Sequence, residues 1–165
     1  LEVDRCGALV FARVASEGAD PHPAPTLAEH LHPYAERLAG ARLPDRFESQ
    51  SLAFFERAFG MTRRFLHESG TYGELETGAT TLAFADHSLG HANFAGGHVA
   101  AHASAQPLGM EIALITPDVP TAHKQALGSG ATELAPPCTK PWGQTVSYLR
   151  CPDGTLVELC TPMAG

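Results

Sequence analysis

The strongest structural signal in the sequence lies in residues 140–160, which read KPWGQTVSYLRCPDGTLVELC. Two segments with alternating apolar residues, 144–149 and 155–160, flank the tetrapeptide Cys151-Pro152-Asp153-Gly154. An Asp-Gly pair supplies the positive φ that a tight turn needs, and Pro152 restricts the backbone that leads into it. We therefore predict an antiparallel hairpin.

The second strand of this hairpin places an acid among core-forming side chains. Because side chains alternate across a strand, Glu158 shares one face with Leu156 and Cys160. The other face carries the apolar residues Val157 and Leu159. A carboxylate is costly to bury unless it is paired, hydrogen-bonded or bound to a metal. Glu158 is therefore the first candidate for a functional residue.

Composition limits the classes of protein to which the chain can belong. Its 165 residues suffice for one domain with a real core, or for two small halves that share one. Lys and Arg number 11 against 18 Asp and Glu, the net charge is -7, and no basic cluster occurs, so we expect no nucleic-acid partner. No apolar stretch approaches the roughly 20 residues of a membrane span, so we expect no membrane partner. The first residues show no signal-peptide pattern, and we expect a cytoplasmic protein.

The cysteines give no sign of a disulfide framework or a zinc site. Cys6, Cys138, Cys151 and Cys160 are the four cysteines of the chain, and none forms a CxxC pair. We predict free thiols packed as small apolar groups. A bond between Cys151 and Cys160 across the hairpin is the less favoured alternative.

From Ser49 onward the chain divides into two similar halves. The second half predicts the order strand, helix, strand, strand, strand, and the first half shows the helix and three strands at matching spacing. Repetition of one unit is therefore expected. The predicted elements are a helix at 51–60 and strands at 63–68, 73–77 and 80–85, then a strand at 110–116, a helix from Asp118 or Thr121 to Leu127, and strands at 131–135, 144–149 and 155–160.

Three further segments are less regular. Residues 7–14 are the best candidate for the strand that opens the first half, and residues 26–41 have helical character. Residues 86–106 are rich in Ala, Gly and His, and we predict a long mobile loop of the kind that often covers a site. His87 and His91 have an i, i+4 spacing that can chelate a metal, but Gly90 between them weakens the helix. We expect most histidines of this loop to face solvent.

Several of these segments resemble the vicinal oxygen chelate superfamily, which includes glyoxalase I, bleomycin-resistance proteins, extradiol dioxygenases and fosfomycin-resistance transferases. The resemblance lies in residues 51–60, 109–114, 140–144 and 152–159 and extends over 49–163. It implies an α+β fold in which paired βαβββ units form a cupped mixed sheet, and it implies a homodimer. We expect a domain at 49–165, with units at 49–86 and 108–163, and an atypical N-terminal segment, 1–48, that supplies the first strand.

The resemblance also implies where a metal would lie. In metal-binding members a divalent ion is held in the cup by the first and last strands of each unit. Glu158 matches the ligand on the final strand, and Glu111 stands where many members have a histidine. Ala83 stands where glyoxalase I has a glutamate, which disfavours glyoxalase I itself. We take Glu158 and Glu111 as the candidate metal ligands and catalytic residues.

Three further side chains are candidates for contact with a substrate. Trp142 precedes the penultimate strand and can form a pocket wall for a flat ligand, or else anchor a loop. Tyr148 lies in the penultimate strand and is a hydrogen-bond partner within reach of Glu158. His67, which we place in a strand, ranks first among the histidines as a further ligand.

Two classes of function stay open. One is a metal-dependent, glyoxalase-like lyase or isomerase, in which a divalent metal of unknown identity polarises vicinal oxygens. The alternative is a metal-free binding or resistance protein for a small drug or antibiotic. An aromatic or a cationic molecule is the candidate, and a cationic one suits the net charge of -7. Both classes predict a small-molecule ligand.

Overall fold

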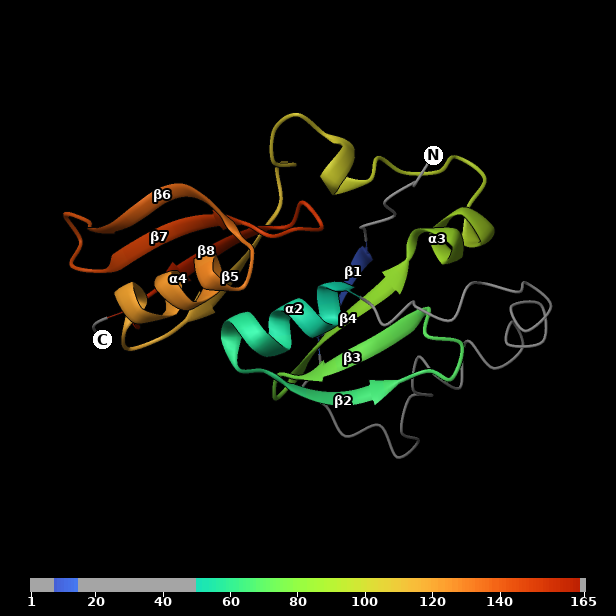
Figure 1. The fold of residues 1–165 in the computed structure, drawn as a ribbon, viewed down its shortest axis with the longest axis horizontal. Coiled ribbons are helices and arrows are strands. Elements are labelled where there is room, and N and C mark those ends of the chain that lie inside the picture. The colour runs from blue at the N-terminus through green and yellow to red at the C-terminus, as the bar shows by residue number, and fades with distance from the viewer. Residues whose placement is uncertain (1–7, 15–49, 164–165) are drawn as a thin grey trace.

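The computed structural model of the chain describes residues 8–14, by their backbone path, and residues 50–163. These residues form two strand-rich units, each with a helix across one face of its sheet (Figure 1). The elements of the first unit are β1 (Ala8–Val14), α2 (Gln50–Phe59), β2 (Thr62–Leu66), β3 (Tyr72–Glu76) and β4 (Thr80–Asp86). The connection contains α3 (His87–Asn93) and the 3-10 turn η1 (Ala101–Ala103). The second unit comprises β5 (Glu111–Ile115), α4 (Val119–Gly128), β6 (Thr132–Thr139), β7 (Thr145–Arg150) and β8 (Leu156–Cys160).

The strands form two four-stranded sheets, with the orders β1-β4-β3-β2 and β5-β8-β7-β6. In the second sheet β5 runs parallel to β8, and the other neighbours are antiparallel. The predicted α+β fold, built from units that repeat one helix and four strands, is confirmed. Each half leaves one sheet face uncovered by its own helix, and these open faces carry the candidate site residues.

The hairpin predicted from residues 144–160 is present as β7 and β8. Its register pairs Tyr148 with Glu158 and Leu149 with Val157. The turn is closed by a hydrogen bond of 2.8 Å from the Cys151 amide to the Thr155 carbonyl, and Gly154 has a φ of 87°. Alternation along β8 is also as expected, since Val157 and Leu159 are fully buried and Glu158 lies on the opposite face.

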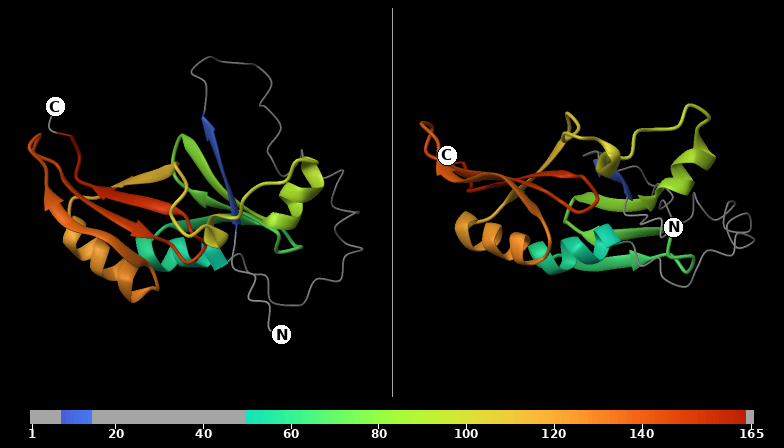
Figure 2. Two further views of the ribbon diagram at one scale, coloured as in Figure 1. Left: turned by 90° about the horizontal axis from the view of Figure 1, so that it is seen from above. Right: turned by 45° about the horizontal axis from the view of Figure 1, so that its top comes forward.

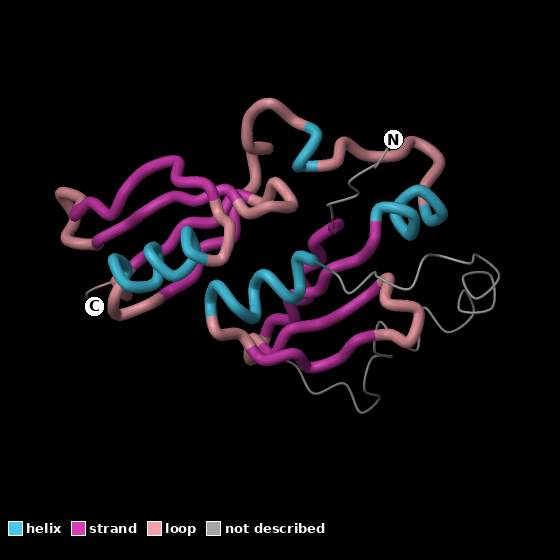
Figure 3. Tube along the Cα trace, in the orientation of Figure 1, coloured by secondary structure: helices cyan, strands magenta, loops and turns pink. Residues whose placement is uncertain are grey.

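One hydrophobic core joins the two units. The helices α2 and α4 lie next to each other, each against its own sheet, as the views in Figures 1, 2 and 3 show. The apolar stripe predicted for 51–60 packs into this core, where the ring of Phe55 lies 5.1 Å from that of Phe59 and 4.9 Å from that of Phe84 on β4. The core takes buried residues from both halves, among them Leu52, Phe54, Phe55, Leu75, Phe84, Val119, Ala126, Leu149, Val157 and Leu159.

The opening strands of the two units run in opposite senses relative to their neighbours. A strand at 7–14 was predicted, and β1 occupies this place beside β4, but β1 is antiparallel to β4 whereas β5 is parallel to β8. The short link from β5 to α4 permits one crossover, while residues 15–49 between β1 and α2 are long enough for either direction. The helix predicted at 26–41 lies outside the described residues.

The connection at 86–106 contains more regular structure than predicted. The helix α3 begins directly after β4, because the Asp86 carboxylate accepts a hydrogen bond of 2.7 Å from the Ser88 amide and caps the first turn. The prediction of a loop over 86–106 was therefore wrong for His87–Asn93, which form a helix, and for Ala101–Ala103, which form a 3-10 turn. No helix in the ranges that the structure describes is both long enough and apolar enough to cross a membrane.

Candidate functional site

Glu158 and Tyr148 form a hydrogen-bonded pair on the open face of the second sheet. They lie directly opposite each other on β8 and β7, and the Tyr148 hydroxyl donates to Glu158 Oε1 over 3.0 Å. Both side chains are half-buried, so Glu158 retains access to solvent. Burial raises the pKa of Tyr148, and the hydrogen bond and negative charge of Glu158 raise it further. The phenol thus stays a donor at neutral pH.

Glu111 lies on the same face, one strand away. In the parallel register Ala113 is opposite Glu158, and Glu111, two residues earlier on β5, shares that face. Its side chain is exposed, and its charge adds to the causes that raise the pKa of both Tyr148 and Cys160. The two carboxylates therefore create a region of negative potential on one sheet face, which favours a cation or a hydrogen-bond donor.

Trp142 and His67 are held by other contacts. Trp142 lies in the turn between β6 and β7, is 61% exposed, and donates from Nε1 to Gln144 Oε1 over 3.0 Å. His67 directly follows β2 of the other sheet, and its Nδ1 lies 2.7 Å from Ser69 Oγ. Because β2 ends at Leu66, the placement of His67 within a strand was wrong. The structure thus brings together Glu158, Tyr148 and Glu111, but not these two side chains.

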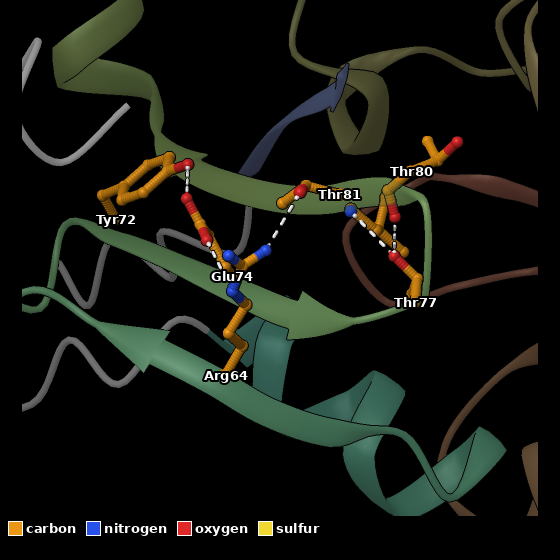
Figure 4. Close-up of polar contacts among 7 residues, drawn as sticks. Arg64, Tyr72, Glu74, Thr77, Thr80 and Thr81 are labelled. Atoms are coloured by element: carbon orange, nitrogen blue, oxygen red, sulfur yellow. Dashed lines mark hydrogen bonds and ion pairs between the residues drawn. The ribbon is translucent and has the colours of Figure 1, made fainter. Parts of the chain in front are cut away.

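A buried acid that the sequence interpretation missed lies in the first unit. Glu74, on β3, is 9% exposed and lies opposite Ala83. The Tyr72 hydroxyl donates to Glu74 Oε1 over 2.7 Å, and Arg64 Nε lies 3.8 Å from Oε2, as Figure 4 shows. Burial raises the pKa of Tyr72, and the hydrogen bond with Glu74 contributes in the same direction. The alternation of Tyr72 and Glu74 around Gly73 is the signal that could have identified this pair.

The two units therefore carry similar pairs in different places. In the second unit the tyrosine and the glutamate face each other across two strands, whereas in the first unit they are two residues apart on one strand. Glu74 of β3 lies opposite Ala83 of β4, just as Tyr148 of β7 lies opposite Glu158 of β8. The acid of the first unit therefore lies on β3, one strand away from the position on β4 that corresponds to Glu158. The missing glutamate at Ala83 does not leave that sheet face without a carboxylate.

The donor groups on this sheet face are too few for a catalytic metal centre. Catalytic metal sites usually take three ligands from the protein. Among residues 50–163, no group of three or more His, Cys, Asp or Glu side chains is placed to hold a metal ion. Glu111 and Glu158 offer two carboxylates, one of which already accepts a hydrogen bond from Tyr148. The residues described in one chain therefore do not fit a complete catalytic metal centre.

Solved structures with this fold come from several bacteria. A glyoxalase-related enzyme from Fulvimarina pelagi aligns with a TM-score of 0.58 at 20% identity, over 68% of this chain and 78% of that one. A glyoxalase/bleomycin resistance protein/dioxygenase family enzyme from Burkholderia phytofirmans aligns with a TM-score of 0.56 at 16% identity, over 69% and 89%. A superfamily member from Sphaerobacter thermophilus aligns with a TM-score of 0.52 at 24% identity, over 68% and 86%. These similarities establish the fold.

The sequence itself places the chain in a family. No curated protein matches it significantly. The model of one superfamily matches residues 48–159, which is more than half of the chain and includes α2 and the site on β7 and β8. The chain therefore belongs to the Glyoxalase/Bleomycin resistance protein/Dioxygenase superfamily.

Proposed function

We propose that this protein binds a small molecule on the open face of the second sheet, with Glu158 and Tyr148 as its polar anchor. The observation that carries the proposal is the 3.0 Å hydrogen bond between these side chains on a half-buried sheet face. A carboxylate oriented by a tyrosine is a ready acceptor for a ligand N–H or a cation. In the described part of the chain Tyr148 bonds Oε1 of Glu158, which leaves Oε2 for a ligand.

The chemistry of the ligand follows from the charge of the face. Glu111 and Glu158 lie on adjacent strands with their side chains on one side, and the whole chain has a net charge of -7. Anionic ligands are disfavoured by both features, and cationic or donor-rich ligands are favoured. We infer a small organic cation, or a neutral molecule with N–H or O–H donors, as the class of ligand.

Pairing with a second copy is part of this proposal. In the described residues β5 is the outer strand of its sheet, so one edge of its backbone is unpaired. Met110, directly before β5, is 67% exposed, and Ile115, the last residue of β5, is 71% exposed. A homodimer that covers this edge would also surround the face that carries Glu111 and Glu158, and light scattering with size-exclusion chromatography tests it.

A metal-assisted lyase or isomerase is the second candidate, favoured by the two carboxylates on one face. It requires at least one more ligand than Glu111 and Glu158 supply, from a second copy or from a residue outside the described ranges. In that case Glu158 would bind the ion and Glu111 would be its neighbour on β5. The metal would supply Lewis-acid polarisation of substrate oxygens.

Calorimetric titration tests both candidates. The probes are Mn²⁺, Ni²⁺ and Zn²⁺ alone, and a panel of organic cations that begins with benzyltrimethylammonium and phenylguanidinium. We expect an organic cation to bind wild-type protein and Glu158→Gln to bind it at least about tenfold more weakly, a loss of about 1.4 kcal/mol. Stoichiometric metal binding that Glu158→Gln abolishes would support the second candidate instead.

The control is an acid outside the site. Glu76 is an exposed glutamate at the end of β3, and Glu76→Gln makes the same change in net charge as Glu158→Gln. We expect Glu76→Gln to bind like wild type. Equal affinity in Glu158→Gln and wild type, for every probe that binds, would refute the proposed site.

A further inference from the structure

A cluster of four histidines lies in the connection between the two units. His87, His91, His98 and His102, called the histidine cluster below, repeat an i, i+4 pair twice within 16 residues. His87 Nδ1 lies 2.6 Å from His98 Nε2, and the centroids of these rings are 4.8 Å apart. The ring of His91 stacks on His98 at 4.8 Å, and His102 lies 5.6 Å from His87. The expectation that these histidines simply face solvent is wrong for His87 and His98, which are partly buried.

The local backbone brings the rings together. The helix α3 carries His87 and His91, and the chain then turns back at Gly97, where φ is 62°. A Cβ at Gly97 would lie 3.5 Å from the His91 ring, so the turn passes in contact with that side chain. Phe94 covers His98 with its ring 5.7 Å away. The stack therefore depends on the folded path of residues 87–98.

The same segment is bound to the second unit by hydrogen bonds and a close backbone contact. The Arg150 guanidinium, on β7, donates to the carbonyls of Ala101 over 2.8 Å and Ser104 over 2.6 Å. Gly154, in the β7–β8 turn, lies so close to η1 that an added Cβ would be 2.2 Å from the Ala101 carbonyl carbon. Residues 87–104 thus link β4 of the first sheet with β7 of the second, along the top of Figure 1.

The surroundings of the histidine cluster favour neutral imidazole rings. The described charged or titratable groups around His87 are Asp86 from the end of β4, His91 from α3, and His98 and His102 from the following segment. Burial lowers the pKa of His87, and the neighbouring histidines lower it further against the opposing effect of Asp86. Arg150, a permanent cation, reaches the same segment from β7.

The contact between His87 and His98 can contain one shared proton. In a neutral pair one ring donates and the other accepts. When both rings are protonated, both facing nitrogens carry an N–H, so this hydrogen bond is lost and two imidazolium rings lie in direct contact. Their outer nitrogens, His87 Nε2 and His98 Nδ1, are buried without a hydrogen-bond partner in the described structure, so neither extra charge would be stabilised there.

We propose that the histidine cluster is a pH-sensitive switch that holds residues 87–104 against Arg150 and Gly154 when neutral and releases this segment when protonated. A free imidazole has a pKa of about 6.5. In the docked segment, burial and the neighbouring histidines lower the pKa of His87 below this value. The undocked segment therefore takes up more protons as the pH falls through this value, and docking is lost in that range. At pH values above this range, residues 87–104 are fully docked.

A metal site is the competing explanation of four clustered histidines. The described residues contain no three side chains placed to hold an ion, and the nearest nitrogens of His87 and His98 already bond each other. The geometry therefore points to a proton as the ligand of the cluster. Zn²⁺ is included in the test for this reason.

Hydrogen exchange of the full chain tests the switch. The amides of Phe94, Gly97, Ala103 and Ser104 are hydrogen-bonded within the segment and report its docking. After correction for intrinsic exchange, we expect them to exchange at least about tenfold faster at about pH 5 than at about pH 7.5, with β7 and β8 unchanged. Equal corrected rates at the two pH values would overturn the proposal.

Variants distinguish protonation of the histidine cluster from general effects of acid on the protein. The double variant His87→Gln and His98→Gln should lose the pH dependence, and His67→Gln, outside the cluster, should retain it. Arg150→Ala should exchange rapidly at both pH values, because the anchor to Ala101 and Ser104 is removed. Unchanged pH dependence in the double variant would overturn the proposal.

Two further measurements complete the test, and the first needs only wild-type protein. Histidine titration by NMR should place the pKa of His87 below the free imidazole value, and a value at or above it would contradict the switch. Zn²⁺ added alone should leave exchange at about pH 7.5 unaltered. Stoichiometric Zn²⁺ binding that slows exchange in wild type but not in the double variant would identify a metal site and overturn the proposal.

Discussion

At the scale of single residues, each unit contains a glutamate whose carboxylate accepts a hydrogen bond from a tyrosine. The two pairs differ in burial, because Glu74 is 9% exposed and Glu158 is half-buried. Arg64 lies beside Glu74, whereas Glu111 adds a second negative charge near Tyr148. The first pair therefore has the surroundings of a structural ion network, and the second those of a ligand site.

Substitution of Glu158 should alter the titration of Tyr148. Glu158→Gln removes a charge and a charged acceptor while burial persists, so we expect the raised pKa of Tyr148 to fall part of the way to its ordinary value. Glu111→Gln should lower it less. Ultraviolet titration of the phenolate measures this, with Tyr148→Phe as the reference that isolates one tyrosine. An unchanged pKa in Glu158→Gln would contradict the hydrogen bond.

Loss of the Tyr72 hydroxyl should destabilise the first unit. Tyr72→Phe leaves the buried Glu74 carboxylate without its 2.7 Å donor, and a hydrogen bond to a buried charge contributes about 1.5–3 kcal/mol. We expect a loss of this size in the free energy of unfolding, measured by urea denaturation. Tyr148→Phe is the matched control and should cost less, because Glu158 remains partly solvated. Equal losses would show that burial does not distinguish the pairs.

At the scale of elements, the β7–β8 turn and η1 define each other's position. Gly154 has a φ of 87° and lies against the backbone of Ala101 and His102, so this site excludes a side chain both by conformation and by space. The turn that the Asp-Gly pair predicts thus serves a second purpose that involves a segment about 50 residues away. The contact is between backbones and therefore independent of side-chain type in η1.

Gly154→Ala should destabilise the fold and displace η1. Strain at positive φ and the clash with Ala101 together predict a loss of about 2–4 kcal/mol in the free energy of unfolding. Gly109→Ala is the control, since an added Cβ there meets nothing within 4 Å. Denaturation measures the loss, and hydrogen exchange of residues 101–104 shows the displacement. A stable Gly154→Ala variant with unchanged exchange would refute the close contact.

At the scale of the whole molecule, the two units share one core through α2 and α4. Buried residues of β3 and β4 belong to the same cluster as those of β7 and β8. Because both helices and both sheets contribute to this one cluster, the halves should unfold together. The open sheet faces, in contrast, are separate within one chain.

Leu149→Ala should unfold both units in one cooperative step. Leu149 is fully buried in the shared core, and truncation of a buried leucine costs about 2–5 kcal/mol. Trp142 fluorescence reports the second unit during urea denaturation, and exchange of the α2 amides reports the first. Coincident transitions, shifted to lower urea, are expected. Separate transitions for the two probes would show independent units.

Much of the fold was predictable from local patterns. The Asp-Gly turn and the alternation of residues 155–160 identify the β7–β8 hairpin, and the stripe of Leu52, Phe55 and Phe59 identifies α2. Such patterns depend on neighbours within a few residues, which is why the sequence contains them directly. The opposition of Tyr148 and Glu158 also follows from the length of the turn between them.

Other features depend on contacts between residues distant in the chain. The antiparallel direction of β1, the burial of Glu74 and the convergence of His87 with His98 each require a register or a packing partner that no local pattern specifies. Local periodicity therefore predicts which residues share a face, because neighbouring side chains alternate in a regular way. Tertiary packing decides which charge, ring or backbone segment each face contacts, because these contacts depend on the free energy of the whole fold.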